Sequence, residues 1–384
     1  MGALASEAHG SSRYPPQLAV LLTDFGDGGV ERMLVNIARG LTECNIRVDF
    51  LVKQANLPYL STLPSRVRLI ELQADREGGL LGALVAYLRT NAPEILLSAK
   101  SADDRLAVKA RSAAGVATRV ALRTGTNLSA RLAVRGKNPL RRWLERYRVR
   151  RLYTQADCVI CVSHGVADDL ARITGLARQA IHVPHNPVVT PELLALAQAS
   201  APHPWLAEQR QWPVVLGAGG LRRQKNFPLL LRAFASLRRQ RPCRLIILGE
   251  GRQRARLGRL AERLGITEDV SLPGFVDNPY AYMARAALFV LSSHWEGSPN
   301  VLTEAMAVGT PVVATDCPSG PREILDGGRY GELVDVDDPI ALARAMDRTL
   351  TSPPSAERLR QAVRRYTLAH SSREYLDALG LRHA

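Results

Sequence analysis

Short apolar segments rich in β-branched residues alternate with longer segments of helical periodicity along almost the whole chain. This alternation is typical of parallel sheets whose strands are joined by covering helices. The pattern therefore predicts an α/β protein with doubly wound sheets. The expected strands are QLAVLL, IRVDFLV, VRLIEL, EILLS, TRVALR, DCVICV and AIHVP in the first half, and VVLGA, CRLIILG, DVSLPG, ALFVLSS, TPVVATD and GELVDV in the second.

The alternation is interrupted once, after His185-Asn186-Pro187, by a proline-punctuated stretch without strand character before Val214. A chain of 384 residues also exceeds the roughly 250 to 300 residues at which a single core stops growing. Two domains are therefore expected, joined by a linker. The predicted divisions are a flexible tail over 1–17, a first domain over 18–190, a linker over 191–212, a second domain over 213–352, and a helical stretch over 353–384 that packs back on the first domain.

The formal net charge of +15 favours anionic partners. Basic residues concentrate between Arg131 and Arg151, where Glu145 is the single acid. In the same segment Leu140, Trp143, Leu144 and Tyr147 follow a helical spacing. The segment predicts a basic amphipathic helix, either a solvated helix with its apolar side on the core or one that docks on an anionic membrane. Nucleic acid is disfavoured, because no stacking platform or recognised binding motif occurs. The basic residues are Arg131, Arg135, Lys137, Arg141, Arg142, Arg146, Arg148, Arg150 and Arg151.

The five cysteines show no clustered spacing, which argues against a disulfide framework and for a reducing compartment. Cys158 and Cys161 form a single CxxC, but they lie inside an expected buried strand, so no metal site is predicted there. The sequence contains no apolar run of about 18 residues, and its N-terminus lacks the features of a signal peptide. We therefore expect a cytoplasmic protein, with peripheral association with the inner face of the membrane left open.

Open α/β sheets bind ligands beyond the carboxyl ends of their strands, so the loops after strands are the candidates for a site. The loop after the first strand contains Gly28-Gly29 and opens directly into a helix, a combination that suits a phosphate group. It departs from the dinucleotide fingerprint because Glu31 occupies the position of the third glycine and would repel a pyrophosphate. A simple tight turn is the alternative.

A second loop, HWEGSPNV, follows the strand ALFVLSS and precedes the helical segment VLTEAMAVG. Pro299 suits the first helical position and Ser298 is placed to cap it. The backbone amides of Asn300 and Val301 would then point toward a bound ligand.

Two glutamates and a lysine add specific chemistry to this loop. Glu304, one turn into the helix, could accept hydrogen bonds from vicinal hydroxyls, or could merely complement the helix dipole. Glu296 stays on the loop. Lys225 lies in the loop after VVLGA, where its ammonium could neutralise a diphosphate. The segment TDCPSGPRE after the strand TPVVATD forms another helix start aimed at the same region.

In this combination and order, the motifs resemble the retaining glycosyltransferases of family 4. The resemblance extends from about Ala19 to Leu350. The segments that carry it are EGSPNVLTEA, LRRQKNF, LPGFVDNPYAYM and GTPVVATDCPSGPREI in the second half, and GDGGVERMLVNIARGL, CVSHGVADDL and HVPHNPV in the first.

The resemblance implies a GT-B fold, in which two doubly wound Rossmann-like domains face a central cleft. It implies transfer of a hexose or N-acetylhexosamine from a nucleoside diphosphate sugar, with UDP favoured over GDP, to a glycan or lipid-linked acceptor with retention of configuration. It implies no metal and no other cofactor. Two alternatives stay open: a nucleotide-sugar-binding protein that has lost transferase activity, and a nucleotide-sugar epimerase of the same fold.

The resemblance also assigns roles to matching residues. Glu304 would bind the ribose hydroxyls, Glu296 would contact hydroxyls of the donor sugar, and Glu296 and Lys225 would be the catalytic residues. The base would rest on the backbone near Phe275 and Val276. The implied donor-binding set is Gly28, Gly29, Arg222, Lys225, Phe275, Val276, Glu296, Gly297, Ser298, Asn300, Val301 and Glu304. Glu31, Arg123 and Gly125 are assigned to the acceptor side.

Two positions depart from the family pattern. The family usually has arginine where this chain has Gly220, so Arg222 or Arg223 is expected to replace it. The family commonly has histidine where this chain has Gly125, at a point that touches the transferred sugar. These departures motivate the alternative of binding without transfer.

Overall fold

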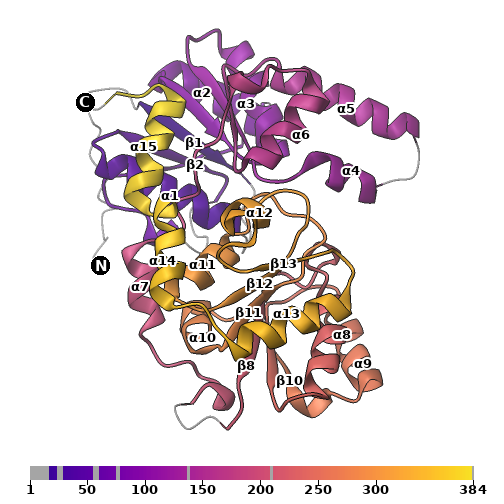
Figure 1. Cartoon of the computed structure of the whole chain (residues 1–384). Coiled ribbons are helices and arrows are strands. Elements are labelled where there is room, and N and C mark those ends of the chain that lie inside the picture. Colours follow the sequence, from indigo (N-terminus) through magenta and orange to yellow (C-terminus); the bar gives the residue numbers. More distant parts are fainter. Residues whose placement is uncertain are drawn as a thin grey trace, which may run out of the picture.

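The structure is a computed structural model and describes residues 17–23, 29–54, 60–74, 78–135, 139–207 and 211–382. The side chains of residues 134, 135, 139 and 141 are not described. Two parallel sheets organise the chain, one in each half, and Figure 1 shows the N-terminal half above the C-terminal half.

The sheet of the N-terminal half has seven strands in the order β3-β2-β1-β4-β5-β6-β7. Strands β1, β2, β4 and β6 are buried along their whole length, because helices cover both faces of the sheet. The strands are β1 (Leu18–Leu22), β2 (Val48–Val52), β3 (Arg68–Glu71), β4 (Ile95–Ser98), β5 (Arg119–Thr124), β6 (Cys158–Cys161) and β7 (Ile181–His182). The helices are α1 (Gly29–Glu43), α2 (Gly79–Asn91), α3 (Ser101–Ala114), α4 (Leu128–Arg135), α5 (Pro139–Tyr153) and α6 (His164–Thr174).

The sheet of the C-terminal half has six strands in the order β10-β9-β8-β11-β12-β13. They are β8 (Val214–Ala218), β9 (Arg244–Leu248), β10 (Val270–Gly274), β11 (Leu288–Leu291), β12 (Val312–Thr315) and β13 (Glu332–Val334). The α-helices are α7 (Pro191–Ala197), α8 (Phe227–Arg238), α9 (Arg254–Leu264), α10 (Pro279–Arg285), α11 (Asn300–Val308), α12 (Pro321–Ile324), α13 (Pro339–Thr351), α14 (Ala356–Ala362) and α15 (Leu368–Leu379). Short 3-10 helices are η1 (Leu60–Thr62), η2 (Arg178–Ala180), η3 (Pro204–Leu206), η4 (Arg223–Lys225), η5 (Thr267–Asp269), η6 (Asp326–Gly328) and η7 (Arg364–Tyr366). No helix in the described ranges is long and apolar enough to cross a membrane.

Every strand expected from the sequence is present in one of these two sheets. Each sheet also reverses its strand order beside its first strand, between β1 and β4 and between β8 and β11. Ligands of such sheets bind beyond the carboxyl ends of the strands at this switch point. The predicted fold class, two doubly wound α/β domains, is confirmed.

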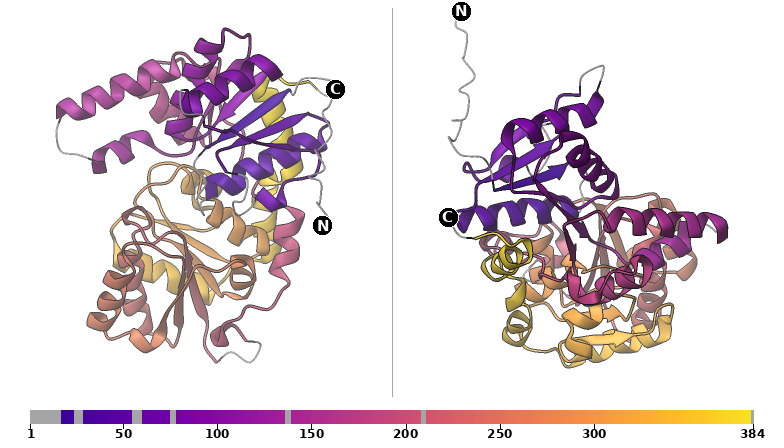
Figure 2. Two further views of the ribbon diagram at one scale, coloured as in Figure 1. Left: turned by 180° about the vertical axis from the view of Figure 1, so that it is seen from behind. Right: turned by 90° about the horizontal axis from the view of Figure 1, so that it is seen from above.

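The last helices cross from the C-terminal half to the N-terminal half (Figures 1 and 2). Helix α14 packs on α11, and α15 packs on α1. The backbone of α1 approaches α15 so closely at Gly40 that a Cβ there would lie 2.0 Å from Ser372 Oγ. Arg119 of β5 also donates a hydrogen bond to the Leu379 carbonyl oxygen at 3.0 Å. The end of the chain is therefore held against the N-terminal sheet.

Two segments differ from simple expectation. The stretch predicted as a linker contains α7, which packs on α10 and α11. The basic segment expected to be one helix is divided between α4 and α5, with residues 136–138 outside the described ranges. Pro139 begins α5, and a proline lacks the amide that would continue a preceding helix. Arg131 therefore belongs to α4, apart from the arginines of α5.

The cysteines are all free, and the CxxC pair lies in the buried strand β6 as predicted. Burial raises the pKa of the Cys158 thiol to about 11 and that of Cys161 to about 12. Both thiols are thus protonated at neutral pH, and the thiolate is the form that binds metals and attacks disulfides. This environment gives the pair an ordinary packing role.

Candidate donor site at the domain interface

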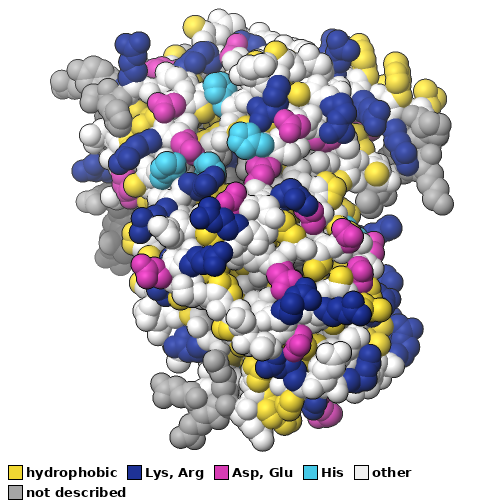
Figure 3. All heavy atoms as spheres, in the orientation of Figure 1, with side chains coloured by type: hydrophobic (Ala, Val, Ile, Leu, Met, Phe, Trp, Pro, Cys, Tyr) yellow, Lys and Arg dark blue, Asp and Glu magenta, His cyan; other side chains and the backbone are white. Residues whose placement is uncertain are grey.

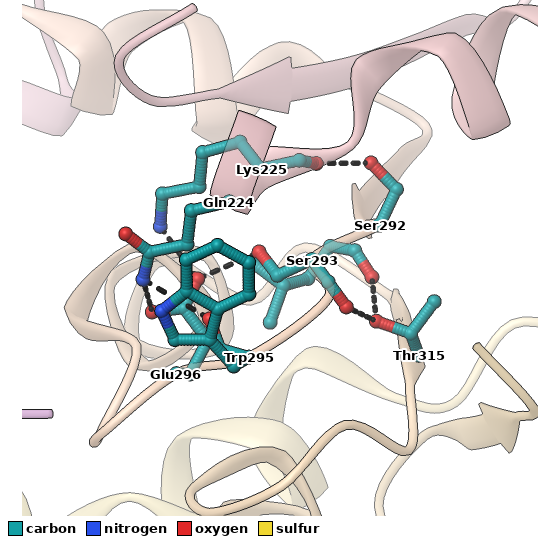
Figure 4. A network of polar contacts seen from close by, with 8 residues as sticks. Gln224, Lys225, Ser292, Ser293, Trp295, Glu296 and Thr315 are labelled. Atoms are coloured by element: carbon teal, nitrogen blue, oxygen red, sulfur yellow. Dashed lines mark hydrogen bonds and ion pairs between the residues drawn. The ribbon is translucent and has the colours of Figure 1, made fainter. Parts of the chain in front are cut away.

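Glu296 follows β11 and is almost fully buried, with 5% of its surface exposed. Its Oε1 atom accepts hydrogen bonds from Lys225 Nζ at 2.7 Å and from Ser293 Oγ at 2.6 Å (Figure 4). Gln224 Nε2 lies 3.4 Å from its Oε2 atom. Such compensation is what a carboxylate needs when it is removed from water. The structure therefore joins the two residues predicted to be catalytic in one buried ion pair.

Both the side chain and the backbone of Lys225 are held by neighbouring residues. Gly219 adopts a φ of +144°, and a Cβ there would lie 3.0 Å from Lys225 Cε, so glycine lets the lysine stem cross the loop. Ser292 Oγ donates a hydrogen bond to the Lys225 carbonyl oxygen at 2.9 Å. These contacts direct the ammonium group at Glu296.

Arg222 lies beside the position at which the family pattern has arginine. Its Nε atom is 3.2 Å from the point that a Cβ of Gly220 would occupy. Both Arg222 and the following Arg223 are exposed. Of the two candidates to replace the missing arginine, Arg222 is the one whose side chain passes over Gly220.

Helix α11 begins one residue later than the sequence indicated. Pro299 is the N-cap with φ −72° and ψ 97°, and no side chain caps the helix. The prediction that Ser298 caps it is therefore wrong, because the helix starts at Asn300 and Ser298 lies outside the capping position. Among the described residues, the backbone amides of Asn300 and Val301 have no hydrogen-bond partner. Free amides at a helix N-terminus are suited to bind a phosphate group.

Glu304 lies one turn into α11 and is 4% exposed. Arg32 of α1 reaches it from the N-terminal half, with Nη1 3.1 Å from Glu304 Oε1, and the same nitrogen is 2.6 Å from the Tyr280 hydroxyl. Burial raises the pKa of Glu304, although the positive charges of Arg32 and Lys225 act in the opposite direction. A group that hydrogen-bonds the carboxylate therefore stabilises it, and vicinal hydroxyls of a ribose could do so.

The two halves come close together at Gly297. A Cβ on Gly297 would lie 2.1 Å from the Gly125 carbonyl oxygen, so only glycine permits this contact. Ser163 Oγ donates a hydrogen bond to the Gly297 carbonyl oxygen at 2.7 Å. The Asn127 amide lies 3.4 Å from the Glu296 carbonyl oxygen. The loop of Glu296 is thus held from both halves.

The second helix start, which contains Glu323, contacts the N-terminal half directly. The carboxylate of Glu323 accepts hydrogen bonds from the amides of His164 and Gly165, both at 2.8 Å. These amides lie at the N-terminus of α6, where a negative charge is favoured by the helix dipole. The carboxylate of Glu323 therefore binds the amides at the N-terminus of α6 that a helix leaves unpaired.

The glycine-rich loop after β1 is described only in part. Gly28 lies outside the described residues, and Gly29 begins α1. Asn300 Nδ2 lies 3.4 Å from the Gly29 carbonyl oxygen, and Asn300 Oδ1 accepts a hydrogen bond from Asn186 Nδ2 at 2.8 Å. The start of α1 and the start of α11 are therefore adjacent, as the predicted diphosphate site requires.

The residues assigned to the acceptor side border a cavity of about 1100 Å³ in the N-terminal half, here called the N-terminal cavity. Arg123 and Gly125 line it, and Glu31 is buried in an ion pair with Lys100, which lines it too, at 2.6 Å. Burial raises the pKa of the lining residue Asp104 to about 7, so this carboxyl is only partly charged at neutral pH. The cationic residues that line the cavity are Lys100, Arg105, Lys109, Arg123, Arg131, Arg148 and Arg151, with Asp104 and Glu145 as the acids.

Phe275 and Val276 follow β10 at the carboxyl end of the same sheet as Glu296. Phe275 is 51% exposed, whereas Val276 packs partly against the core. Both therefore stand at the sheet edge that carries the donor loops, where a nucleotide base could lie against their backbone.

One group in the described residues has the composition of a metal site. It consists of His185, His370 and Glu374, whose ligand atoms lie within 4.8 Å of one another. His185 Nδ1 is 2.9 Å from Glu374 Oε2, and the His185 amide donates to the same oxygen at 2.7 Å. These contacts tie α15 to the segment that follows β7.

Several residues at this interface were not singled out from the sequence. Ser163 and Asn186 lie in CVSHGVADDL and HVPHNPV, two segments that carry the family resemblance, which could have marked them. Arg32 lies in GDGGVERMLVNIARGL, another segment that carries the resemblance, but an arginine on a helix is most often solvated, so the sequence did not indicate its ion pair with Glu304.

The fold has close counterparts among solved structures. Anabaena HepE in complex with UDP superposes with a TM-score of 0.75 at 18% identity, covering 95% of this chain and 99% of that chain. The lipopolysaccharide outer core galactosyltransferase WaaB in its apo form superposes with a TM-score of 0.70 at 20% identity, covering 94% and 98%. The two parallel-sheet domains therefore form the GT-B fold of glycosyltransferases.

Sequence comparisons show the family to which the chain belongs. The family model "Glycosyltransferase Family 4" matches residues 27–191, and the model "Glycosyl transferases group 1" matches residues 206–366. The N-acetylgalactosamine-N,N'-diacetylbacillosaminyl-diphospho-undecaprenol 4-alpha-N-acetylgalactosaminyltransferase of Campylobacter jejuni is 27% identical over 367 residues, 91% of this chain and 93% of that protein. The lipopolysaccharide core biosynthesis glycosyltransferase LpsE of Rhizobium meliloti is 31% identical over 223 residues, 58% of this chain and 62% of that protein. The chain belongs to the family 4 glycosyltransferases.

Proposed function

We propose that this glycosyltransferase moves a hexose or N-acetylhexosamine from a nucleoside diphosphate sugar, UDP in preference to GDP, to a glycan or lipid-linked acceptor with retention of configuration. The observation that carries the proposal is the convergence of Lys225, Glu296 and the free amides at the start of α11 on one interface. In support, HepE was solved with UDP and with UDP-glucose. The name of the Campylobacter relative describes transfer to a diphospho-undecaprenol-linked sugar.

The reaction requires stabilisation of the leaving diphosphate while the bond from the anomeric carbon to the phosphate oxygen breaks. Lys225 and the amides of Asn300 and Val301 would supply fixed positive charge at that oxygen, which is usually the largest catalytic contribution. Glu296 already accepts hydrogen bonds from Lys225 and Ser293, which makes it a weak nucleophile. We therefore propose attack by the acceptor hydroxyl on the face that the diphosphate leaves, with the hydroxyl proton passing to the departing phosphate oxygen.

The positive charge of the N-terminal cavity favours a negatively charged acceptor. Cationic side chains outnumber acidic ones along its lining, and the acid Asp104 is only partly ionised at neutral pH. An acceptor that carries phosphate groups would complement this charge. We propose a lipid diphosphate-linked glycan as the acceptor class.

A thermal-shift screen of UDP-, GDP- and ADP-sugars tests the donor. A UDP-sugar is expected to raise the melting temperature most, because a ligand at 100 times its dissociation constant stabilises the folded state by about 2.7 kcal/mol. Transfer should persist in EDTA, since in this proposal Lys225 and the helix amides would supply the positive charge that a metal supplies elsewhere. Proton NMR of the product should show the anomeric configuration of the donor.

Other outcomes of the screen would identify the alternatives. Binding without turnover on a broad acceptor panel would indicate a nucleotide-sugar-binding protein. Release of an epimerised sugar without any acceptor would indicate an epimerase, and an inverted product would refute retention.

Helix α5 projects from the N-terminal half (Figures 1 and 2). It presents an apolar stripe to solvent. Leu140 is 71%, Trp143 62% and Tyr147 51% exposed. The interpretation in which this apolar side faces the core is therefore wrong, because among the described side chains of α5 only those near Tyr153 pack on the N-terminal half. Figure 3 shows hydrophobic side chains in the region of α5 flanked by lysine and arginine side chains. The exposed arginines there are Arg142, Arg146, Arg148, Arg150 and Arg151.

We propose that α5 docks on an anionic membrane surface, with peripheral attachment at the cytoplasmic face. Exposed aromatic and aliphatic side chains insert at the headgroup boundary while arginines bind the anionic headgroups. Changing Arg142, Arg146 and Arg150 together to glutamine should weaken binding to phosphatidylglycerol vesicles by about a hundredfold, at about 1 kcal/mol per arginine. Cosedimentation measures this.

Helix α9 provides a matched control for the membrane experiment. Changing its exposed Arg256, Arg259 and Arg263 to glutamine alters net charge equally, but α9 has no large exposed apolar side chain among its described residues. The α9 variant should bind vesicles like the wild type. Equal loss in both variants, or no loss in the α5 variant, would contradict docking through α5.

A further inference from the structure

Arg123 is a buried cation whose partners are neutral. It lies in β5 with 2% of its surface exposed. Its Nε donates a hydrogen bond to the Tyr375 hydroxyl at 2.8 Å, and its Nη2 donates to Asn186 Oδ1 at 2.6 Å. No carboxylate of the described residues forms an ion pair with it. Buried charges are normally paired, so among the described residues this guanidinium lacks the negative charge that its burial calls for.

The remaining nitrogen of Arg123 lies next to the donor loop. Nη1 is 3.8 Å from the point that a Cβ of Gly125 would occupy, and within the described parts of the chain it has no hydrogen-bond partner. The carbonyl oxygen of Gly125 is the atom that a Cβ on Gly297 would approach to 2.1 Å. Nη1 therefore lies close to where the two halves meet, beside the position that the family usually fills with histidine.

Asn186 connects Arg123 to the start of the donor helix. Its Oδ1 accepts from Arg123, and its Nδ2 donates to Asn300 Oδ1 at 2.8 Å. Two hydrogen bonds thus separate the guanidinium from the first residue of α11, whose amide and that of Val301 are unpaired. A helix N-terminus and a guanidinium group both favour phosphate oxygens.

We propose that Arg123 binds the diphosphate of the donor from the N-terminal half, while Lys225 binds it from the C-terminal half. This inference rests on the donor site proposed above and moves Arg123 from the acceptor side to the donor side. The diphosphate supplies the negative charge that Tyr375 and Asn186, the described side-chain partners of Arg123, do not provide. The absence of a side chain at Gly125 leaves room for the ligand to reach Nη1.

Titration of UDP and UMP into wild-type protein and the variant Arg123→Gln tests the inference. UDP affinity is expected to fall by at least about thirtyfold in the variant, because a buried charge pair is lost. UMP affinity should change by less than about threefold, since UMP has one phosphate and carries less negative charge for Arg123 to bind. The UDP affinity of Arg123→Lys should lie between those of the wild type and Arg123→Gln, because lysine keeps the charge but lacks the planar guanidinium group.

Arg119→Gln is the matched control. Arg119 lies on the same strand and binds the same helix, through the Leu379 carbonyl oxygen, but stands at the opposite end of β5. This variant should keep the wild-type ratio of UDP to UMP affinity. Loss of the hydrogen bonds to Tyr375 and Asn186 should lower the melting temperature of Arg123→Gln. The ratio of UDP to UMP affinity is therefore the readout that a purely structural role would not change.

The possible failures separate the two proposals. If wild-type protein binds no nucleoside diphosphate, the proposed donor site itself is wrong. If wild-type protein binds UDP more tightly than UMP and Arg123→Gln or Arg123→Lys keeps the wild-type ratio, only the role of Arg123 is overturned. A lower melting temperature with equal loss of both affinities would make Arg123 a structural residue and also overturn it.

Discussion

Replacing Lys225 with methionine is expected to lower sugar-transfer turnover by about a hundred- to a thousandfold, the usual effect of removing one preorganised donor from a developing negative charge. UDP affinity should fall as well, because in the proposed site the ammonium would also bind the ground-state diphosphate. The variant should also be less stable. Its Glu296 would remain buried without the 2.7 Å ion pair, and breaking such a pair costs up to about 3 to 5 kcal/mol. Turnover assays, UDP titration and thermal melts measure the three effects.

The double variant Lys225→Met with Glu296→Gln separates stability from catalysis. Its melting temperature should recover, because no buried charge is left unpaired, while turnover should stay low. Glu296→Gln alone should keep UDP affinity close to that of the wild type and reduce transfer at least about tenfold, because a sugar contact is lost. Loss of UDP binding in Glu296→Gln, or normal turnover in Lys225→Met, would contradict the assigned roles.

Replacing Glu304 with glutamine should have opposite effects on stability and binding. Burial raises the pKa of Glu304, despite the charges of Arg32 and Lys225. A carboxyl with a raised folded-state pKa adds stability that is fully present below its unfolded pKa of about 4.3 and is lost as pH rises through the folded pKa. At neutral pH, Glu304→Gln should therefore melt at the same or a higher temperature, and the difference should shrink as pH falls toward 4.

The same variant should bind nucleotides poorly. Hydrogen bonds to a charged group are worth about 1.5 to 3 kcal/mol, so UDP affinity should fall at least about tenfold. The wild type should prefer UDP over 2′-deoxy-UDP, and Glu304→Gln should lose that preference. If the preference persists in the variant, Glu304 does not bind the ribose hydroxyls.

The strands and their loops could be predicted from the sequence. Strands such as β8 and β11 are buried on both faces, so they appear as unbroken apolar runs that stand out without tertiary information. Because ligands bind beyond strand ends, the same pattern pointed to the loops of Lys225 and Glu296. The start of α11 was harder to predict, because Ser298 was expected to cap the helix and Pro299 is the N-cap, one residue later.

The exposed face of α5 could not be predicted in the same way. Leu140, Trp143 and Tyr147 have the spacing of a buried stripe, and the sequence does not say whether another element covers it. Only the packing of neighbouring helices leaves this stripe in solvent. The spacing of apolar residues therefore predicted the helix but not its surroundings.

By itself, the sequence determined the α/β class, the strands and the glutamate loop of this glycosyltransferase, because these depend on periodicity and on residues close together in the chain. Only the tertiary structure decided which charges meet. Lys225 pairs with Glu296 across 71 residues, Arg32 with Glu304 across 272, and Arg123 binds Tyr375 across 252. Local sequence patterns report neighbours within one helical turn or one strand, so contacts over these separations emerge only when the two domains and α15 pack together.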